Sequence, residues 1–171
     1  MICKGWFWLT AKNRHGIHSK FVYDFLDLAL YTLPKQNRLP EQKLLSAALT
    51  HFKPKQLGVN PKWIAMPDWI AATCSEDLTR NIPYDFYVTD AEDTELKALI
   101  HQENLWSKNA VIFIGGIRRN KKNYKNWKKL CSYDVIRVSL EVYEAGLLCF
   151  RPQQAPQHFK IRLNSSIFGK L

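Results

Sequence analysis

The stretch Ala110-Val-Ile-Phe-Ile-Gly-Gly116 decides the fold class of this chain. Its unbroken apolar run is typical of a strand buried on both faces, as in parallel sheets that helices cover on each side. A basic segment over residues 120–130 follows, with Tyr124 and Trp127 spaced to share one helical face. The sequence therefore predicts a strand followed by a helix, the repeating unit of α/β folds.

The same alternation extends toward the amino terminus. Residues 84–89 predict a strand that places Asp90 at its carboxyl end, and residues 94–102 predict the helix that follows. Residues 56–59 predict a short strand that includes Gly58. Strands that alternate with helices imply right-handed crossovers and a largely parallel sheet.

Helices are expected ahead of the first strand. Residues 1–9 are apolar and aromatic and predict a short helix, which either packs on the domain or contacts a partner or membrane surface. Ser19 is placed to cap a second helix, and Pro40 lies in the first turn of a third. The second helix has apolar residues at helical spacing: Phe21, Val22, Phe25, Leu26, Leu28 and Ala29. We expect residues 1–53 to form a helical segment and residues 54–171 an α/β domain, together one compact unit.

The carboxyl-terminal part predicts further strands over residues 135–142, 145–150 and 159–163. Their short connections favour antiparallel pairing, because parallel neighbours need a longer crossover. The expected fold is therefore a reduced, mostly parallel sheet with amino-terminal helices and carboxyl-terminal antiparallel strands.

Composition bounds the partners and the compartment. The 171 residues carry a net charge of +10, which favours contact with a polyanion or an acidic protein. No apolar run approaches the roughly 20 residues of a membrane span. The cysteines Cys3, Cys74, Cys131 and Cys149 are scattered, without the spacing of a zinc or redox site. We expect a cytoplasmic protein with free thiols.

Two segments of the sequence carry a family resemblance. Ala11-Lys-Asn-Arg-His-Gly-Ile-His-Ser-Lys-Phe-Val-Tyr-Asp-Phe25 resembles the opening of a Bacteroidota family of class I S-adenosylmethionine (SAM)-dependent methyltransferases, with Lys20 in place of the usual proline. Residues 138–151 and 158–162 are similar to that family's final strands, and Trp127 fits a tryptophan before them. The resemblance implies a shortened, Rossmann-like, class I methyltransferase-like fold.

The resemblance also implies a SAM site, but its motifs are altered. The family's E-L-G-T-x-x-G motif becomes Gln56-Leu-Gly-Val-Asn-Pro-Lys62, in which Gly58 remains and Pro61 lacks an amide hydrogen. Asp68 is the plausible substitute for the ribose-binding acid, and Asp90 survives at the fourth strand. The acidic pair after the fifth strand has become Gly115-Gly116.

Three functions follow from these observations. The first is a degenerate, non-catalytic protein that binds or scaffolds a partner without cofactor or metal. The second is an active methyltransferase with an atypical SAM pocket, in which Gly58, Asp68 and Asp90 contact the cofactor. The third is a nucleic-acid-binding protein that contacts phosphates through the basic segment. Its candidate residues are Arg118, Arg119, Lys121, Lys122, Lys125 and Lys129.

Other polar residues carry alternatives. The cations of the basic segment equally suit a solvated helix face. Asp90, Glu92 and Asp93 suit either an oxygen-ligand metal site or the capping of a helix amino terminus. His15 and His18 suit either acid–base and phosphate chemistry or hydrogen bonds that tie the amino-terminal segment to the domain.

Overall fold

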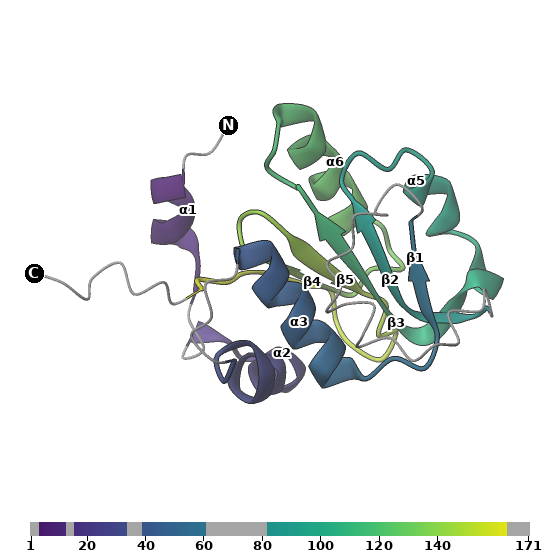
Figure 1. Cartoon of the computed structure of the whole chain (residues 1–171), viewed down its shortest axis with the longest axis horizontal. Helices are drawn as coiled ribbons and strands as arrows, with labels where there is room; N and C mark the ends of the chain where they lie inside the picture. The colour runs from purple at the N-terminus through teal and green to yellow at the C-terminus, as the bar shows by residue number, and fades with distance from the viewer. Residues whose placement is uncertain (1–3, 13–15, 34–38, 61–81, 164–171) are drawn as a thin grey trace, which may run out of the picture.

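A computed structural model describes residues 4–12, 16–33, 39–60 and 82–163 of the chain (Figure 1). Its centre is a six-stranded sheet in the order β1-β2-β3-β5-β4-β6. The strands are β1 (Leu57–Val59), β2 (Tyr84–Asp90), β3 (Trp106–Gly115), β4 (Val138–Glu141), β5 (Gly146–Cys149) and β6 (Gln157–Lys160). Strand β5 runs antiparallel to β3 and β4, and the remaining pairs are parallel. The predicted α/β class with a mostly parallel sheet is confirmed, and β4 and β5 form the expected antiparallel pair, whereas the last strand, β6, is parallel to β4.

Helices cover both faces of the sheet (Figure 1). The helices are α1 (Lys4–Thr10), α2 (Lys20–Phe25) with the π-helical turn η2 (Leu26–Leu30), α3 (Pro40–Phe52), α5 (Leu96–Leu99), the 3₁₀ turn η4 (Glu103–Leu105) and α6 (Lys121–Cys131). Val111 and Phe113 of β3 face α2, η2 and α3, whereas Ile112 and Ile114 face α5 and α6. The apolar run that predicted a doubly buried strand thus alternates between two cores. Among the described residues, no helix combines the length and apolarity that crossing a bilayer requires.

The first helices begin where the sequence predicts. The Ser19 hydroxyl accepts a hydrogen bond from the Val22 amide and caps α2, and Pro40 occupies the first turn of α3. Leu28, expected on the buried face, is instead 68% exposed. The chain widens to a π-turn here, with the Tyr31 amide bonded to the Leu26 carbonyl, and the shifted phase buries Leu30 in its place.

Other predicted boundaries move by a few residues. The helix expected over 94–102 is the shorter α5, and β3 begins at Trp106, ahead of the apolar run. Trp106 is buried because its indole nitrogen donates to the Leu99 carbonyl and its ring packs on Tyr87. The ring contact joins β2 and β3, two separate strands, and local periodicity does not register such a contact.

The segments that carry the family resemblance meet in the structure. Lys12 forms a parallel bridge with Ile161, beyond the end of β6. The Arg162 guanidinium donates to the Trp8 and Ala11 carbonyls, at 2.6 and 3.3 Å, and lies over the Trp8 ring. The segment over residues 8–12 is thereby fixed to residues 161–162, next to the edge strand β6.

Candidate functional site

Polar side chains gather where β1, β2 and β3 end. In the sheet register Asp90, the last residue of β2, is opposite Gly115, the last residue of β3. Asn60 follows β1 and its amide bonds to the Val88 carbonyl. Ligands of open α/β sheets bind outside the carboxyl ends of the strands. The fold therefore predicts a site at this edge, by which we mean the carboxyl ends of β1, β2 and β3.

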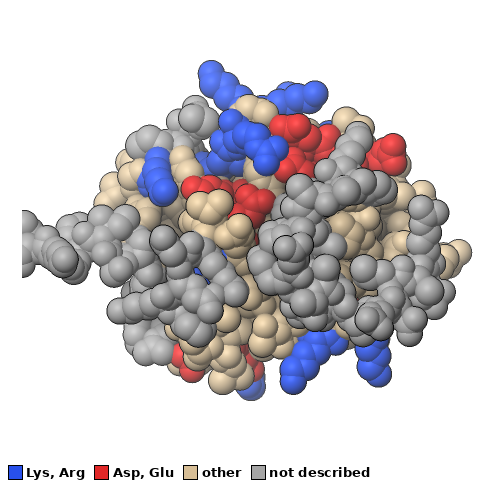
Figure 2. Space-filling view, in the orientation of Figure 1, with Lys and Arg blue, Asp and Glu red and all other residues tan. Residues whose placement is uncertain are grey.

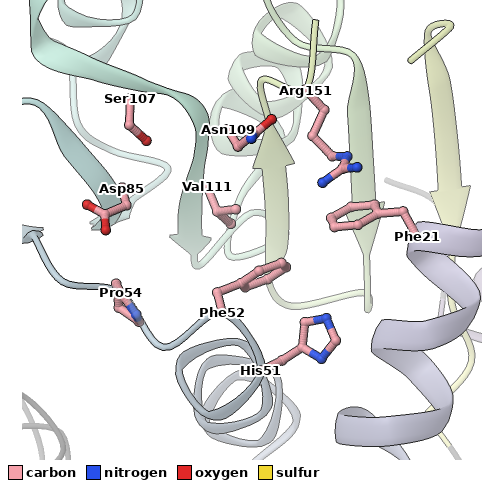
Figure 3. Close-up of a pocket in the computed structure, with 9 residues that line it drawn as sticks. All are labelled: Phe21, His51, Phe52, Pro54, Asp85, Ser107, Asn109, Val111 and Arg151. Atoms are coloured by element: carbon pink, nitrogen blue, oxygen red, sulfur yellow. The ribbon is translucent and has the colours of Figure 1, made fainter. Parts of the chain in front are cut away.

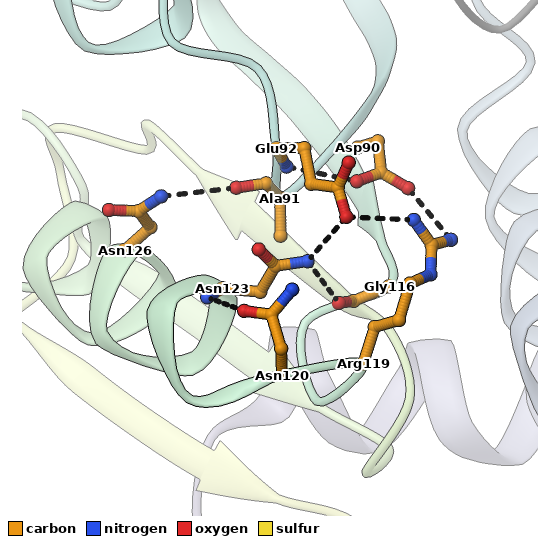
Figure 4. A network of polar contacts seen from close by, with 8 residues as sticks. All are labelled: Asp90, Ala91, Glu92, Gly116, Arg119, Asn120, Asn123 and Asn126. Atoms are coloured by element: carbon orange, nitrogen blue, oxygen red, sulfur yellow. Dashed lines mark hydrogen bonds and ion pairs between the residues drawn. The ribbon is translucent and has the colours of Figure 1, made fainter.

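An arginine bridges two acids at this edge. The Arg119 guanidinium lies 3.1 Å from the Asp90 carboxylate and 3.4 Å from that of Glu92 (Figure 4). Burial by itself would lower the pKa of Arg119, but the two carboxylates outweigh it and raise that pKa above its ordinary value. The charge of Asp90, a predicted cofactor-binding residue, is therefore already compensated within the chain.

The loop after β3 fits closely around this bridge. Gly116 has a φ of +63°, and a Cβ there would come within 2.9 Å of an Asp90 oxygen and of the Arg119 guanidinium. The Asn123 side chain donates to the Gly116 carbonyl, and the Asn120 side chain caps α6 (Figure 4). Glycine at 116 therefore makes room for the ion pair.

Sequence reasoning missed these asparagines. Asn120, Asn123 and Asn126 recur at three-residue spacing, and Asn126 donates to the Ala91 carbonyl after β2. The signal that could have found them is that spacing at the start of a helix, which puts the amides on one face.

The Asp93 carboxylate holds the turn that leads into α5. It accepts hydrogen bonds from the Glu95 and Leu96 amides, from the Thr89 hydroxyl at 2.8 Å and from the Asn60 amide at 2.6 Å. These hydrogen bonds occupy the acceptor positions of the Asp93 carboxylate. No group of three metal-ligating side chains occurs within the ranges that the structure describes.

Gly58 has a structural role different from the one the resemblance suggests. A Cβ at Gly58 would come within 2.5 Å of the Tyr87 ring and 3.0 Å of the Tyr84 ring. The missing side chain therefore makes room for two tyrosines of β2. Burial, with a smaller contribution from Asp93, raises the pKa of Tyr87 to about 12, so this phenol stays neutral at physiological pH. Asp68 lies outside the described residues.

Glu41 is a further acid at this edge that sequence reasoning missed. It lies half-buried in the first turn of α3, where acids at helix amino termini are common. Burial and then the Asp90 charge raise the pKa of Glu41, although a hydrogen bond from the Gly116 amide and the Arg119 charge oppose that rise. Figure 2 shows acidic side chains beside basic ones on this face.

The described residues at this edge do not fit SAM. Asp90 is held by Arg119, and Gly58 is covered by tyrosine rings instead of being open to a ligand. The Arg119 guanidinium would also lie near a cofactor that is itself a cation. No methyl-transfer step is derived from this arrangement.

The cations of the basic segment divide into two groups. Arg118 is buried at 6% exposure, pairs with Glu141, and lies over the Phe7, Tyr124 and Tyr143 rings. Arg118 is therefore not part of an exposed cationic surface, contrary to the prediction, whereas the exposed Arg119 side chain is paired with Asp90 and Glu92. The exposed cations of α6, here the lysine face, are Lys121, Lys122, Lys125, Lys128 and Lys129. Trp127 and Leu130 lie on the buried face of that helix, as predicted for Trp127.

The histidine motif is only partly described. His15 lies outside the described residues, and His18 is exposed. The residue of this motif that ties the segment to the rest of the chain is Ser19, whose hydroxyl also accepts from the Gln154 side chain at 3.4 Å.

The comparisons with known proteins add no family. No family model, no curated protein and no solved structure matches the chain.

Proposed function

We propose that this chain is a methyltransferase-like protein that has lost methyl transfer and acts as a binding or scaffold module. The observation that carries the proposal is the Arg119 bridge between Asp90 and Glu92. It occupies the strand ends where a related enzyme would hold its cofactor.

Two further features support the proposal. The amino- and carboxyl-terminal segments that resemble the methyltransferase family pair through Lys12 and Ile161, so the resemblance lies in one connected part of the fold. The polar groups at the candidate site, by contrast, make contacts with one another. A Cβ at Gly116 would meet the bridge, and the Asn60 side chain donates to Asp93.

A calorimetric titration with SAM and with S-adenosylhomocysteine tests the proposal. We expect no heat of binding from the folded parent at millimolar ligand, because binding would have to break the Arg119 bridge. Arg119→Ala exposes Asp90, and Lys108→Gln, which removes an exposed charge near the start of β3, is the control. Micromolar binding by the parent that Asp90→Ala abolishes would overturn the proposal and establish an active pocket.

The lysine face favours a second function, contact with nucleic-acid phosphates. Its lysines are all exposed, and the α6 sequence contains no acidic residue to neutralise them. Such an array attracts phosphates irrespective of base sequence, and its binding weakens steeply with salt.

Filter binding of mixed-sequence single-stranded RNA and DNA over a salt series tests this function. The triple variant Lys122→Glu, Lys125→Glu, Lys129→Glu should lower the slope of log K against log salt by about 2, as expected for lost phosphate contacts. The control places the same charge change on exposed lysines outside α6, at Lys12, Lys55 and Lys108. An equal loss of nucleic-acid affinity in both triple variants would mean that net charge drives binding and that the lysine face has no particular role.

A further inference from the structure

A second candidate site lies at the opposite ends of the strands, where β2 and β3 begin. A pocket of about 380 Å³ opens there, within the size range of small-molecule sites (Figure 3). Phe21 and Phe52 form apolar walls, and Arg151, His51, Asp85 and Asn109 bring polar groups to it. None of these residues belongs to the Arg119 edge.

Arg151 is held in a backbone conformation that its side chain does not favour. It follows the end of β5 with a φ of +36°, in the left-handed region where a Cβ is costly. Such strained residues cluster at ligand sites, where the surrounding structure maintains them. Here the strained residue is the one that brings a positive charge to the pocket.

The guanidinium of Arg151 is positioned before any ligand arrives. Its Nε donates to the Gln154 side chain at 2.5 Å, and Gln154 in turn donates to Ser19, the cap of α2. The guanidinium carbon lies 4.0 Å from the centre of the Phe21 ring. Figure 3 shows the group above that ring, on the side of the pocket that Asn109 also borders.

The other titratable groups of the pocket are hydrogen-bonded or neutral, whereas Arg151 keeps terminal guanidinium nitrogens for a ligand. Asp85 accepts hydrogen bonds from the Lys55 and Gln56 amides, at 2.9 and 3.2 Å. His51 packs edge-on against Phe25 and Phe52, and burial lowers its pKa, so the ring is neutral at physiological pH. Among the described residues, no carboxylate forms an ion pair with Arg151.

We propose that this pocket binds a small carboxylate with a flat apolar body, its carboxylate on Arg151 and its body against the wall that the adjoining Phe21 and Phe52 rings form. A guanidinium fork offers parallel donors that match a carboxylate, and its two terminal nitrogens remain for that purpose. The Asn109 amide borders the same end of the pocket, and aromatic walls suit a planar body. The inference is independent of the methyltransferase resemblance.

Amide chemical-shift titration with benzoate and benzamide tests the proposal, because the two probes share a shape and differ in charge. Benzoate should give saturable shifts at Asn109 and Val111, and benzamide should not. Arg151→Gln should weaken benzoate at least about tenfold, the loss expected for a charge-assisted hydrogen-bonded pair. Lys97→Gln, on the other face of the sheet, should leave binding unchanged.

A second variant guards against misfolding. Arg151→Gly suits the left-handed backbone and removes the guanidinium, so it should fold and still lose benzoate binding. The proposal is overturned if benzoate shifts do not saturate, if they fall elsewhere on the protein, or if the folded Arg151→Gly variant binds benzoate as the parent does.

Discussion

The Trp127 indole occupies the space that a side chain at Gly146 would take. A Cβ built at Gly146 would come within 2.3 Å of the Trp127 Cη2 atom. The indole, 2% exposed, also donates from Nε1 to Glu141 at 3.3 Å. The α6 helix is thereby seated on β5 at one position, where a large side chain meets a glycine.

This relationship predicts a coupled pair of substitutions. Gly146→Ala should cost about 1–3 kcal/mol of unfolding free energy, because the added methyl group overpacks the site. Trp127→Ala should cost about 3–5 kcal/mol through the cavity it leaves. In the double variant the methyl group no longer meets the ring, so the loss should be smaller than the sum.

Urea denaturation of the four proteins measures the coupling. Gly16→Ala is the matched control, since a Cβ there meets the flexible Lys12 side chain at 3.3 Å. Additive losses in the double variant would mean that Gly146 is not there to accommodate the indole.

A buried ion pair gives a second prediction. Arg118 and Glu141 are almost fully buried, and Arg118 Nη1 has no hydrogen-bond partner. Glu141→Gln leaves the guanidinium without a compensating charge and should cost about 3–5 kcal/mol. Arg118→Met combined with Glu141→Gln removes the uncompensated charge and should restore part of that loss.

Glu144→Gln supplies the control for this pair. Glu144 lies in the loop between β4 and β5, pairs with Lys4 at 3.7 Å and is more exposed, so its loss should cost less than about 1 kcal/mol. Chemical denaturation compares the variants. Equal losses for Glu141→Gln and Glu144→Gln would contradict the stabilising role assigned to the buried pair.

Local patterns in the sequence account for much of the fold. The apolar run in β3 predicts a doubly buried strand, and Ser19 and Pro40 mark helix starts, because strand burial and helix capping depend on neighbouring residues. The period-3.6 pattern of the second helix misplaces Leu28, since a single π-turn changes the phase without changing the composition.

The candidate site is less predictable because it depends on contacts between distant segments. Glu41 comes near Asp90 only because α3 packs on the sheet. In the sequence Arg119 belongs to a run of cations, and only the loop between β3 and α6 brings it to Asp90. Gly58 resembles a cofactor-loop glycine in the sequence, yet the Tyr87 ring explains it in the structure. The roles of Asp90 and Gly58 in SAM binding remain predictions for the titration to test.

The thiols of the buried Cys149 and the half-buried Cys131 give a third prediction. Burial raises the pKa of Cys149 to about 12, and burial together with nearby charge raises that of Cys131 to a similar value. Since the thiolate is the reactive form, both should react with N-ethylmaleimide at pH 8 more than about 100-fold slower in the native protein than in urea. Peptide mapping by mass spectrometry follows each site separately. Equal native and unfolded rates at Cys149 would contradict its burial.

Glu41 gives a fourth prediction, on pH dependence. Its pKa in the folded protein is raised above the ordinary value of a glutamate, by burial first and by Asp90 next. Between the unfolded and folded pKa values the native state therefore holds a proton that the unfolded state has released. Stability from this group is present at low pH and is lost as pH rises through that window.

Glu41→Gln keeps an acceptor for the Gly116 amide and removes the titration, so the stability of this variant relative to the parent should increase between pH 4 and pH 7. Urea denaturation across that range, with exposed Glu103→Gln as control, measures the difference. A stability difference that stays constant with pH, or that decreases as pH rises, would mean that Glu41 does not experience the acidic, half-buried environment beside Asp90.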